Sequence, residues 1–218
     1  MLEFARTYQE AQVTGIDTRP FMICHANKRF QEKQVANAHA LCVPSYLEQL
    51  PFNEASFDLV SIQFIGLFLC TERWPVLLKE CKRFLQKHGY IRITEYELAQ
   101  SNAPTMEEWN MLCQRLLRQR GQNPVNWLCE LEPMITAAGF QESSAVPHIV
   151  NYSYGVPMHE DWKRDLMLWT RKWLPQMIEL GLITQEAALS LGERVQREMS
   201  FPNFHALQHF LTVWGRKS

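Results

Sequence analysis

The stretch LPFNEASFDLV, residues 50–60, decides the fold class because it joins a turn to a buried strand. Pro51, Asn53 and Ser56 are residue types that favour turns. The apolar residues that follow them form a short run typical of a buried strand. We therefore expect a strand over residues 59–64, entered through a turn.

Strands and helices alternate on both sides of this stretch. Short apolar runs predict strands, and apolar residues at helical spacing predict the helices between them. The expected strands are 13–16, 38–43, 59–64 and 90–94, and the expected helices between them start at Pro20 and run over 72–87. This alternation predicts an α/β fold with a mostly parallel sheet and helices on both faces.

Composition excludes several classes of function. The 218 residues suit one domain with an inserted subdomain. The 22 basic and 23 acidic residues nearly cancel, which argues against nucleic acid or an anionic membrane as a partner. No apolar run approaches the roughly 20 residues of a membrane span. Six cysteines without a CxxC pair predict a reducing, cytoplasmic location without disulfides.

Four stretches, taken in order, resemble the class I S-adenosylmethionine-dependent methyltransferase family. VTGID resembles the second strand of that family, and LPFNEASFDLV resembles the signature before its fourth strand. ECKRFL followed by GYI resembles the helix that leads into the fifth strand. The last part of the chain resembles the antiparallel sixth and seventh strands. These stretches are residues 13–17, 50–60, 80–91 and 144–216.

The resemblance implies a domain organisation. A Rossmann-like α/β core would comprise residues 1–154 and 204–218, with an antiparallel C-terminal strand. Residues 155–203 would form a helical insert before the last strand, which in this family covers the substrate pocket as a lid.

The resemblance also implies an activity and a cofactor. The chain would transfer a methyl group from S-adenosyl-L-methionine to a small molecule. Asp17, with the adjoining Thr18, would bind the ribose hydroxyls, because a carboxylate at a strand end can accept from both. Ser45 would meet the adenine, and Gln63 and Phe64 would flank the methionine part. The generous aromatic content favours an apolar or aromatic acceptor.

Two departures from the family leave a second function open. The first strand and its glycine-rich loop would lie before Leu2, so we expect a longer natural product or a sheet that closes differently, including with a partner's strand. Pro44 stands where the family has an adenine-binding acid. The alternative is a non-catalytic methyltransferase-like protein, or a truncated fragment with impaired cofactor binding, that serves in association.

Three residues are candidates for catalysis. Glu95 follows the expected fifth strand, where the family places substrate-facing groups; the alternative is a solvated loop carboxylate. Tyr152 and His159 enter the helical insert, where His159 could act as a base because its pKa lies near neutral pH. The alternative for both is ordinary packing.

Two further patterns favour structural explanations. His205 and His209 lie four residues apart without a third ligand, so we predict no metal site. Trp162, Trp169 and Trp173 keep helical spacing, which indicates a buried stripe or the surface of a homodimer. The sequence leaves open the methyl acceptor, the methylated atom and the oligomeric state.

Overall fold

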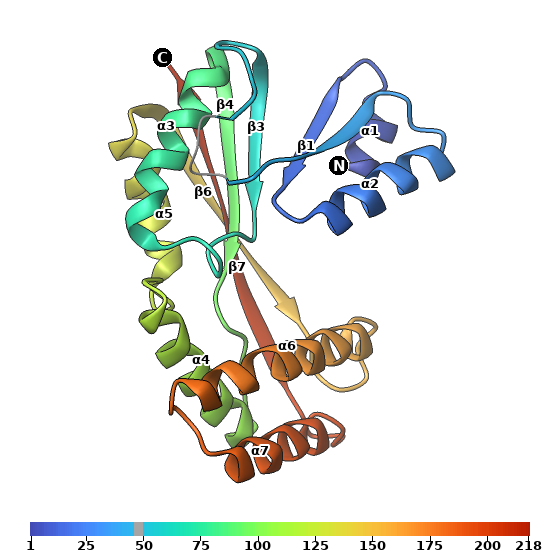
Figure 1. Cartoon of the computed structure of the whole chain (residues 1–218), viewed down its shortest axis with the longest axis vertical. Coiled ribbons are helices and arrows are strands. Elements are labelled where there is room, and N and C mark those ends of the chain that lie inside the picture. The colour runs from blue at the N-terminus through green and yellow to red at the C-terminus, as the bar shows by residue number, and fades with distance from the viewer. Residues whose placement is uncertain (46–49) are drawn as a thin grey trace. The chain divides into compact units, whose positions relative to one another are not determined.

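A computed structural model of the chain describes residues 1–45 and 50–218 (Figure 1). The chain forms two compact units, Met1–Phe52 and Asn53–Ser218. In the described residues no helix combines the length and apolar character needed to cross a membrane.

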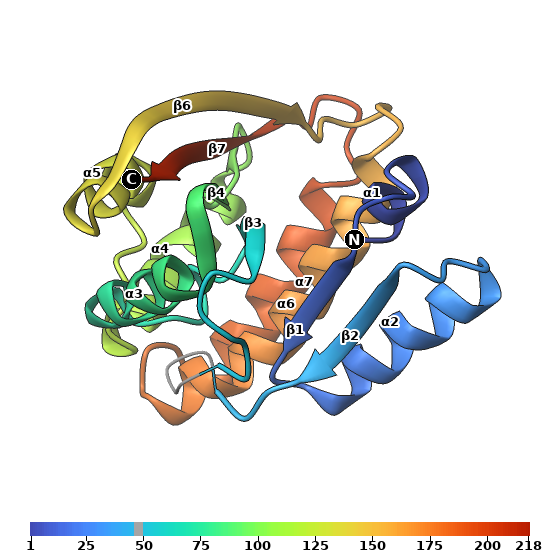
Figure 2. The same cartoon turned by 90° about the horizontal axis from the view of Figure 1, so that it is seen from above.

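The first unit is a small α/β layer. Its elements are α1 (Leu2–Thr7), β1 (Val13–Asp17), α2 (Pro20–Glu32) and β2 (Ala38–Cys42). β1 and β2 are parallel neighbours with α2 packed along them (Figure 2). The Asn27 side chain on α2 satisfies both backbone groups of Ala40: its Nδ2 donates to the Ala40 carbonyl at 2.9 Å, and its Oδ1 accepts from the Ala40 N–H at 2.8 Å.

The second unit contains a mixed sheet and most of the helices. In chain order its elements are β3 (Phe57–Gln63), a 3-10 turn (Thr71–Arg73), α3 (Trp74–Phe84), β4 (Leu85–Tyr96), β5 (Gln100–Ser101), α4 (Pro104–Gln119), α5 (Trp127–Ala137), β6 (Phe140–Asn151), α6 (His159–Glu179), α7 (Gln185–Glu198) and β7 (Ala206–Lys217). β3 and β4 are parallel. β7 runs antiparallel to β4, and β6 and the short β5 pair antiparallel with β7.

These elements confirm the α/β class, the parallel neighbours and the antiparallel closing strand that the sequence predicts. β3 begins two residues before the expected strand, and β4 extends from Leu85 to Tyr96, well beyond the expected 90–94. α3 and α5 pack beside the sheet (Figure 1). α6 and α7 form the helical pair that separates β6 from β7.

One edge of β1 and one edge of β3 have no partner strand among the described residues. β1 pairs with β2 alone, and β3 pairs with β4 alone. The family resemblance places its first strand beside these two strands. None of the described strands takes that position.

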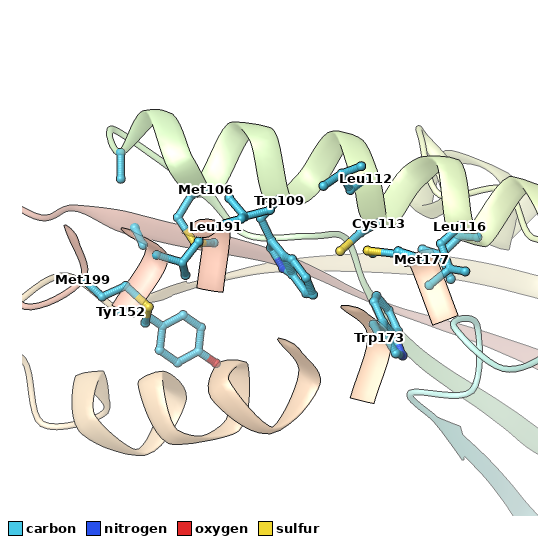
Figure 3. Close-up of a cluster of buried hydrophobic side chains, with 14 of the residues drawn as sticks. Met106, Trp109, Leu112, Cys113, Leu116, Tyr152, Trp173, Met177, Leu191 and Met199 are labelled. Carbon is cyan, nitrogen blue, oxygen red and sulfur yellow. The ribbon is translucent and has the colours of Figure 1, made fainter. Parts of the chain in front are cut away.

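A hydrophobic core lies among α4, α6 and α7 and includes Ala206 of β7. Met106, Trp109 and Cys113 of α4 recur at helical spacing and are buried against Trp173 of α6 and Leu191 of α7 (Figure 3). The Trp109 and Trp173 rings stack with centroids 6.3 Å apart. This packing holds the inner face of α6 toward the end of the sheet.

Candidate functional site

A cavity of about 250 Å³ lies within the second unit, at the carboxyl ends of β3 and β4. Phe64 directly follows β3, Tyr96 is the last residue of β4, and both side chains line the cavity. Ligands of α/β proteins bind in the crevice at the carboxyl ends of parallel strands. The cavity is therefore the candidate functional site.

Helix α6 supplies one wall of the cavity. Trp162, Trp169 and Trp173 lie on the same face of this helix, together with Asp165 and Leu166. The spacing of three or four residues between them places all five on that face. The three tryptophans, for which the sequence left a buried stripe or a dimer surface open, thus line a cavity, with Trp173 2% exposed and the other two half-buried.

Phe64 holds an unusual backbone conformation at the end of β3. Its φ of 57° lies in the left-handed region, which a bulky side chain avoids at a cost of about 1–3 kcal/mol. The ring is held by edge-to-face contacts with Tyr96, at a centroid distance of 5.3 Å, and with Phe210, at 5.9 Å. The Phe64 N–H donates to the Thr94 carbonyl at 3.0 Å. Strained residues of this kind cluster at functional sites.

The amide side chains of the cavity are oriented by their surroundings. Asn110 Nδ2 donates to the Ala99 carbonyl at 2.8 Å, and Gln208 Nε2 donates to the Glu97 carbonyl at 3.0 Å. A carbonyl can only accept, so the NH₂ end of each amide faces the backbone and uses one of its two N–H donors there. Each amide keeps its oxygen and one N–H for a ligand.

Two tyrosines complete the polar lining. Burial raises the pKa of Tyr96, and the nearby charges of Glu95 and Asp165 raise it further. Burial, followed by the charge of Asp165, also raises the pKa of Tyr152. Both hydroxyls therefore stay protonated near neutral pH and can donate hydrogen bonds, whereas neither is suited to act as a base.

Tyr152 is the catalytic candidate that the structure places in the cavity wall. Its ring stacks on Trp162, with centroids 5.0 Å apart and planes 8° from parallel. Glu95 and His159, the other two candidates, do not line the cavity. The structure thus separates the three residues that the sequence grouped by role.

Glu95 lies inside β4 and is only 1% exposed, so its interpretation as a solvated loop carboxylate is wrong. Its Oε1 accepts hydrogen bonds from the backbone N–H groups of Ile65, at 2.7 Å, and Gly66, at 3.1 Å. Burial raises the pKa of Glu95 to about 7, although these two hydrogen bonds act in the opposite direction. Glu95 therefore holds the loop that carries Phe64 into the cavity.

His159 is the first residue of α6 and is 2% exposed. Its Nδ1 lies 2.8 Å from the Tyr152 carbonyl oxygen, so this nitrogen carries the proton and donates. The ring packs against Tyr154 and Phe204. These contacts tie the start of α6 to the end of β6.

Asp17 lies at the end of β1 in the first unit, as the sequence indicates. Its carboxylate accepts from the Arg19 backbone N–H at 2.8 Å and from the Arg19 Nε at 3.2 Å. Burial acts to raise the pKa of Asp17, but the hydrogen bonds and charge of Arg19 outweigh it and hold the pKa below its ordinary value. Asp17 is therefore an ionised acceptor, held by the Arg19 backbone N–H and by an arginine side chain that is 60% exposed.

The other predicted cofactor residues are divided between the two units. Thr18 and Ser45 belong to the first unit, and Ser45 is half-buried. Gln63 and Phe64 belong to the second unit. Gln63 ends β3 and is exposed, with its Nε2 donating to Ser61 Oγ at 3.4 Å. Of these residues, Phe64 is the one found in the cavity wall.

Sequence reasoning missed several residues of the cavity, above all Asp165. An acidic residue within an aromatic helical stripe, between Trp162 and Trp169, is the signal that could have marked it. Tyr96, Trp109 and Phe210 come from three other elements. No local pattern relates those three to α6.

Comparisons with known proteins bear on the fold. Residues 1–89 match the family described as methyltransferase domain. The chain is similar to phosphoethanolamine N-methyltransferase 2 of Haemonchus contortus, with 19% identity, a TM-score of 0.53, and coverage of 99% of this chain and 46% of that chain. It thus spans less than half the length of that enzyme. No curated protein matches the sequence at a significant level.

Two further solved structures share the fold. YcgJ of Bacillus subtilis is 16% identical, with a TM-score of 0.57 and coverage of 94% of this chain and 82% of that chain. The [4+2]-cyclase SpnF is 17% identical, with a TM-score of 0.55 and coverage of 99% and 69%. At such identities the likeness shows the fold. The strand order, the match of residues 1–89 and these neighbours identify the chain as a protein of the class I S-adenosylmethionine-dependent methyltransferase fold.

Proposed function

We propose that the chain is an S-adenosylmethionine-dependent methyltransferase whose small-molecule acceptor binds in the cavity of the second unit. The observation that carries this proposal is the position of the cavity at the carboxyl ends of β3 and β4, in a chain whose residues 1–89 match the methyltransferase domain. The strained Phe64 in its wall supports the same assignment.

The chemistry of Asp17 supports the assignment of the cofactor at its ribose. In the first unit, the ionised Asp17 at the end of β1 suits the two ribose hydroxyls, and the backbone near Ser45 would meet the adenine. In the second unit, Gln63 and Phe64 would flank the methionine part. When bound, S-adenosylmethionine supplies an electrophilic methyl group.

The chain's own contribution would be alignment and exclusion of water. Methyl transfer depends mainly on holding the nucleophile in line with the methyl group. Aromatic walls from α4 and α6 exclude water, while Tyr152 and the amide oxygens can orient a polar group. The aromatic or apolar acceptor expected from the sequence is part of this proposal.

Calorimetric titration with S-adenosylhomocysteine tests the proposal, because binding requires no acceptor. Asp17→Ala is expected to weaken binding by about 1–3 kcal/mol, the scale of lost hydrogen bonds to a charged group. Arg19→Ala is the matched control: it removes the side-chain donor, keeps the backbone N–H on the carboxylate, and should leave the affinity equal or tighter. Equal affinities of wild type and Asp17→Ala would show that the ribose contact is misplaced.

The second candidate is a non-catalytic, methyltransferase-like protein, or a fragment with impaired cofactor binding, that serves in association. Two observations favour it. The Asp17 carboxylate already holds Arg19, and Pro44, which lacks an N–H, follows β2 where the family has an acid. SpnF, named as a cyclase, also has this fold. A folded sample that does not bind S-adenosylhomocysteine would favour this candidate.

We also propose a cytoplasmic location. All six cysteines are free thiols, and three of them, Cys24, Cys42 and Cys129, are exposed. Exposed free thiols suit a reducing compartment. To check this, the protein would be isolated in the presence of an alkylating reagent and analysed by mass spectrometry. We expect all three exposed cysteines to carry the alkyl group, which shows that they were free thiols in the cell.

A further inference from the structure

We propose that the cavity of the second unit selects an organic cation, an alkylammonium group, as the recognised part of the acceptor. This inference rests on the proposed function and names the chemical class of the acceptor. It follows from the walls of the cavity, from its polar groups and from its charge.

Aromatic side chains from several elements line the cavity. α6 contributes Trp162, Trp169 and Trp173, and Tyr152 stacks on the first of them. Phe64, with its partners Tyr96 and Phe210, lies at the strand ends. The negative faces of such rings attract an ammonium group, and rings surrounding one are the usual means of binding quaternary ammonium ligands.

Two of these rings already bind cations on the chain itself. Lys172 Nζ lies 5.3 Å from the centroid of the Trp169 ring, and the Arg120 guanidinium lies 5.9 Å from that of Trp173. Neither cation is among the residues that line the cavity. Trp169 is half-buried and lines the cavity, whereas Trp173, at 2% exposed, offers a ligand little of its ring.

The polar groups of the cavity include several hydrogen-bond acceptors. Asn110 and Gln208 each keep the amide oxygen, together with one N–H, after the other N–H has bonded the backbone. Asp165 adds a carboxylate, and no Lys, Arg or His is among the described residues of the lining. The tyrosine hydroxyls can both donate and accept hydrogen bonds. A ligand rich in donors matches this set, whereas a phosphate would be repelled.

Asp165 distinguishes a cation from a neutral apolar ligand. It is exposed at the cavity and has neither a hydrogen bond nor an ion pair with the described residues. The neighbouring Asp161, on the same helix, pairs with Arg164 at 3.3 Å instead. A neutral ligand would gain nothing from the Asp165 charge, whereas a cation beside the aromatic rings would be attracted by it.

The volume restricts the ligand to a small one. About 250 Å³ lies below the roughly 300–1,000 Å³ of pockets that take drug-sized molecules. A small amine, or the cationic head of a larger molecule, fits that limit.

The test compares two probes of equal shape, choline and its neutral carbon isostere 3,3-dimethylbutan-1-ol. Binding is followed on the full chain by calorimetry and by the fluorescence of the cavity tryptophans. Choline is expected to bind about tenfold more tightly than the isostere, on the scale of cation–π and ionic contacts. A choline affinity equal to or below that of the isostere, or no choline binding, overturns the proposal.

Three variants locate the effect. Asp165→Asn should weaken choline about tenfold and leave the isostere unchanged. Asp161→Asn removes the same charge outside the cavity and should change neither affinity. Trp169→Leu keeps an apolar wall without the aromatic face, so it should weaken choline several-fold and spare the isostere. Equal losses for both probes would indicate an apolar site and contradict the assignment.

The outcome separates this inference from the methyltransferase proposal, because choline binding requires no cofactor. Binding of S-adenosylhomocysteine without selectivity for choline would support the methyltransferase proposal and contradict the cation site. Selectivity for choline without binding of S-adenosylhomocysteine would support the cation site and contradict the methyltransferase proposal.

Discussion

Replacing Trp173 by alanine is expected to destabilise the second unit by about 3–5 kcal/mol, the range for removing a large aromatic side chain from a core. Trp173 is 2% exposed and stacks on Trp109, while Trp169 packs on it edge-to-face at a centroid distance of 4.8 Å. Its loss would leave a space between α4 and α6 that backbone shifts can only partly close. Urea unfolding followed by circular dichroism measures the change, together with a fall in Tm of roughly 10 °C.

The matched control is Leu168→Ala on the same helix. Leu168 is 56% exposed, so its truncation should alter the free energy of unfolding by less than about 0.5 kcal/mol. A loss below about 1 kcal/mol for Trp173→Ala would mean that α4 and α6 do not pack in solution as described here.

Replacing Glu95 by glutamine is expected to stabilise the protein above pH 7 and to remove a pH dependence of the wild type. The buried Glu95 has a pKa of about 7, raised from an ordinary value of 4.5. Between these two values the folded state binds more protons than the unfolded state. The free energy of unfolding therefore falls as pH rises through this window.

The size of the effect follows from the same two values. The contribution of Glu95 is fully present below pH 4.5 and is lost above pH 7, a change of about 3 kcal/mol. Glutamine carries no charge, and its Oε1 can still accept from the N–H groups of Ile65 and Gly66. Urea unfolding at pH 5 to 8 should show the difference between variant and wild type growing with pH.

Two further variants frame this result. Glu107→Gln, at an exposed position of α4, removes one negative charge without touching the buried group and should keep the wild-type slope. Glu95→Ala removes the acceptor of two backbone N–H groups and should destabilise at every pH. If Glu95→Gln keeps the slope of the wild type, another group titrates in this window.

The same variant examines the catalytic role considered for Glu95. A carboxylate that only holds the loop of Ile65 and Gly66 can be replaced by an amide with little loss of activity. A general base cannot be replaced in this way, because an amide does not take up a proton at neutral pH. If Glu95→Gln keeps more than about one tenth of the wild-type methyl-transfer activity, Glu95 is a positioning residue that holds the loop and is not a general base.

The order of elements could be predicted from the sequence because it depends on local patterns. Turn residues before an apolar run marked β3, and apolar residues at helical spacing marked α3 and α6. The resemblance in residues 13–17 and 50–60 indicated which family of α/β proteins the chain is similar to. Comparison with solved structures confirms the fold that these stretches indicate.

The site depended on tertiary structure. Periodicity assigned Trp162, Trp169 and Trp173 to one face of a helix, but it carries no information about what that face meets. Phe64 and Tyr96 lie at strand ends and Trp109 on a different helix, so only the packing of the second unit brings them to one cavity. Glu95 illustrates the same limit, because its burial depends on the loop at residues 65–66.

The sequence by itself thus determined the class of the fold, the order of its strands and the helical face that carries the tryptophans. Tertiary structure decided which groups share an environment, since long-range contacts join residues that are far apart in the chain. It buried Glu95 and His159 away from the cavity and placed Asp165 beside the aromatic rings. The charge of a site follows from such placement, because burial and neighbouring groups set it and neither is a local property of the sequence.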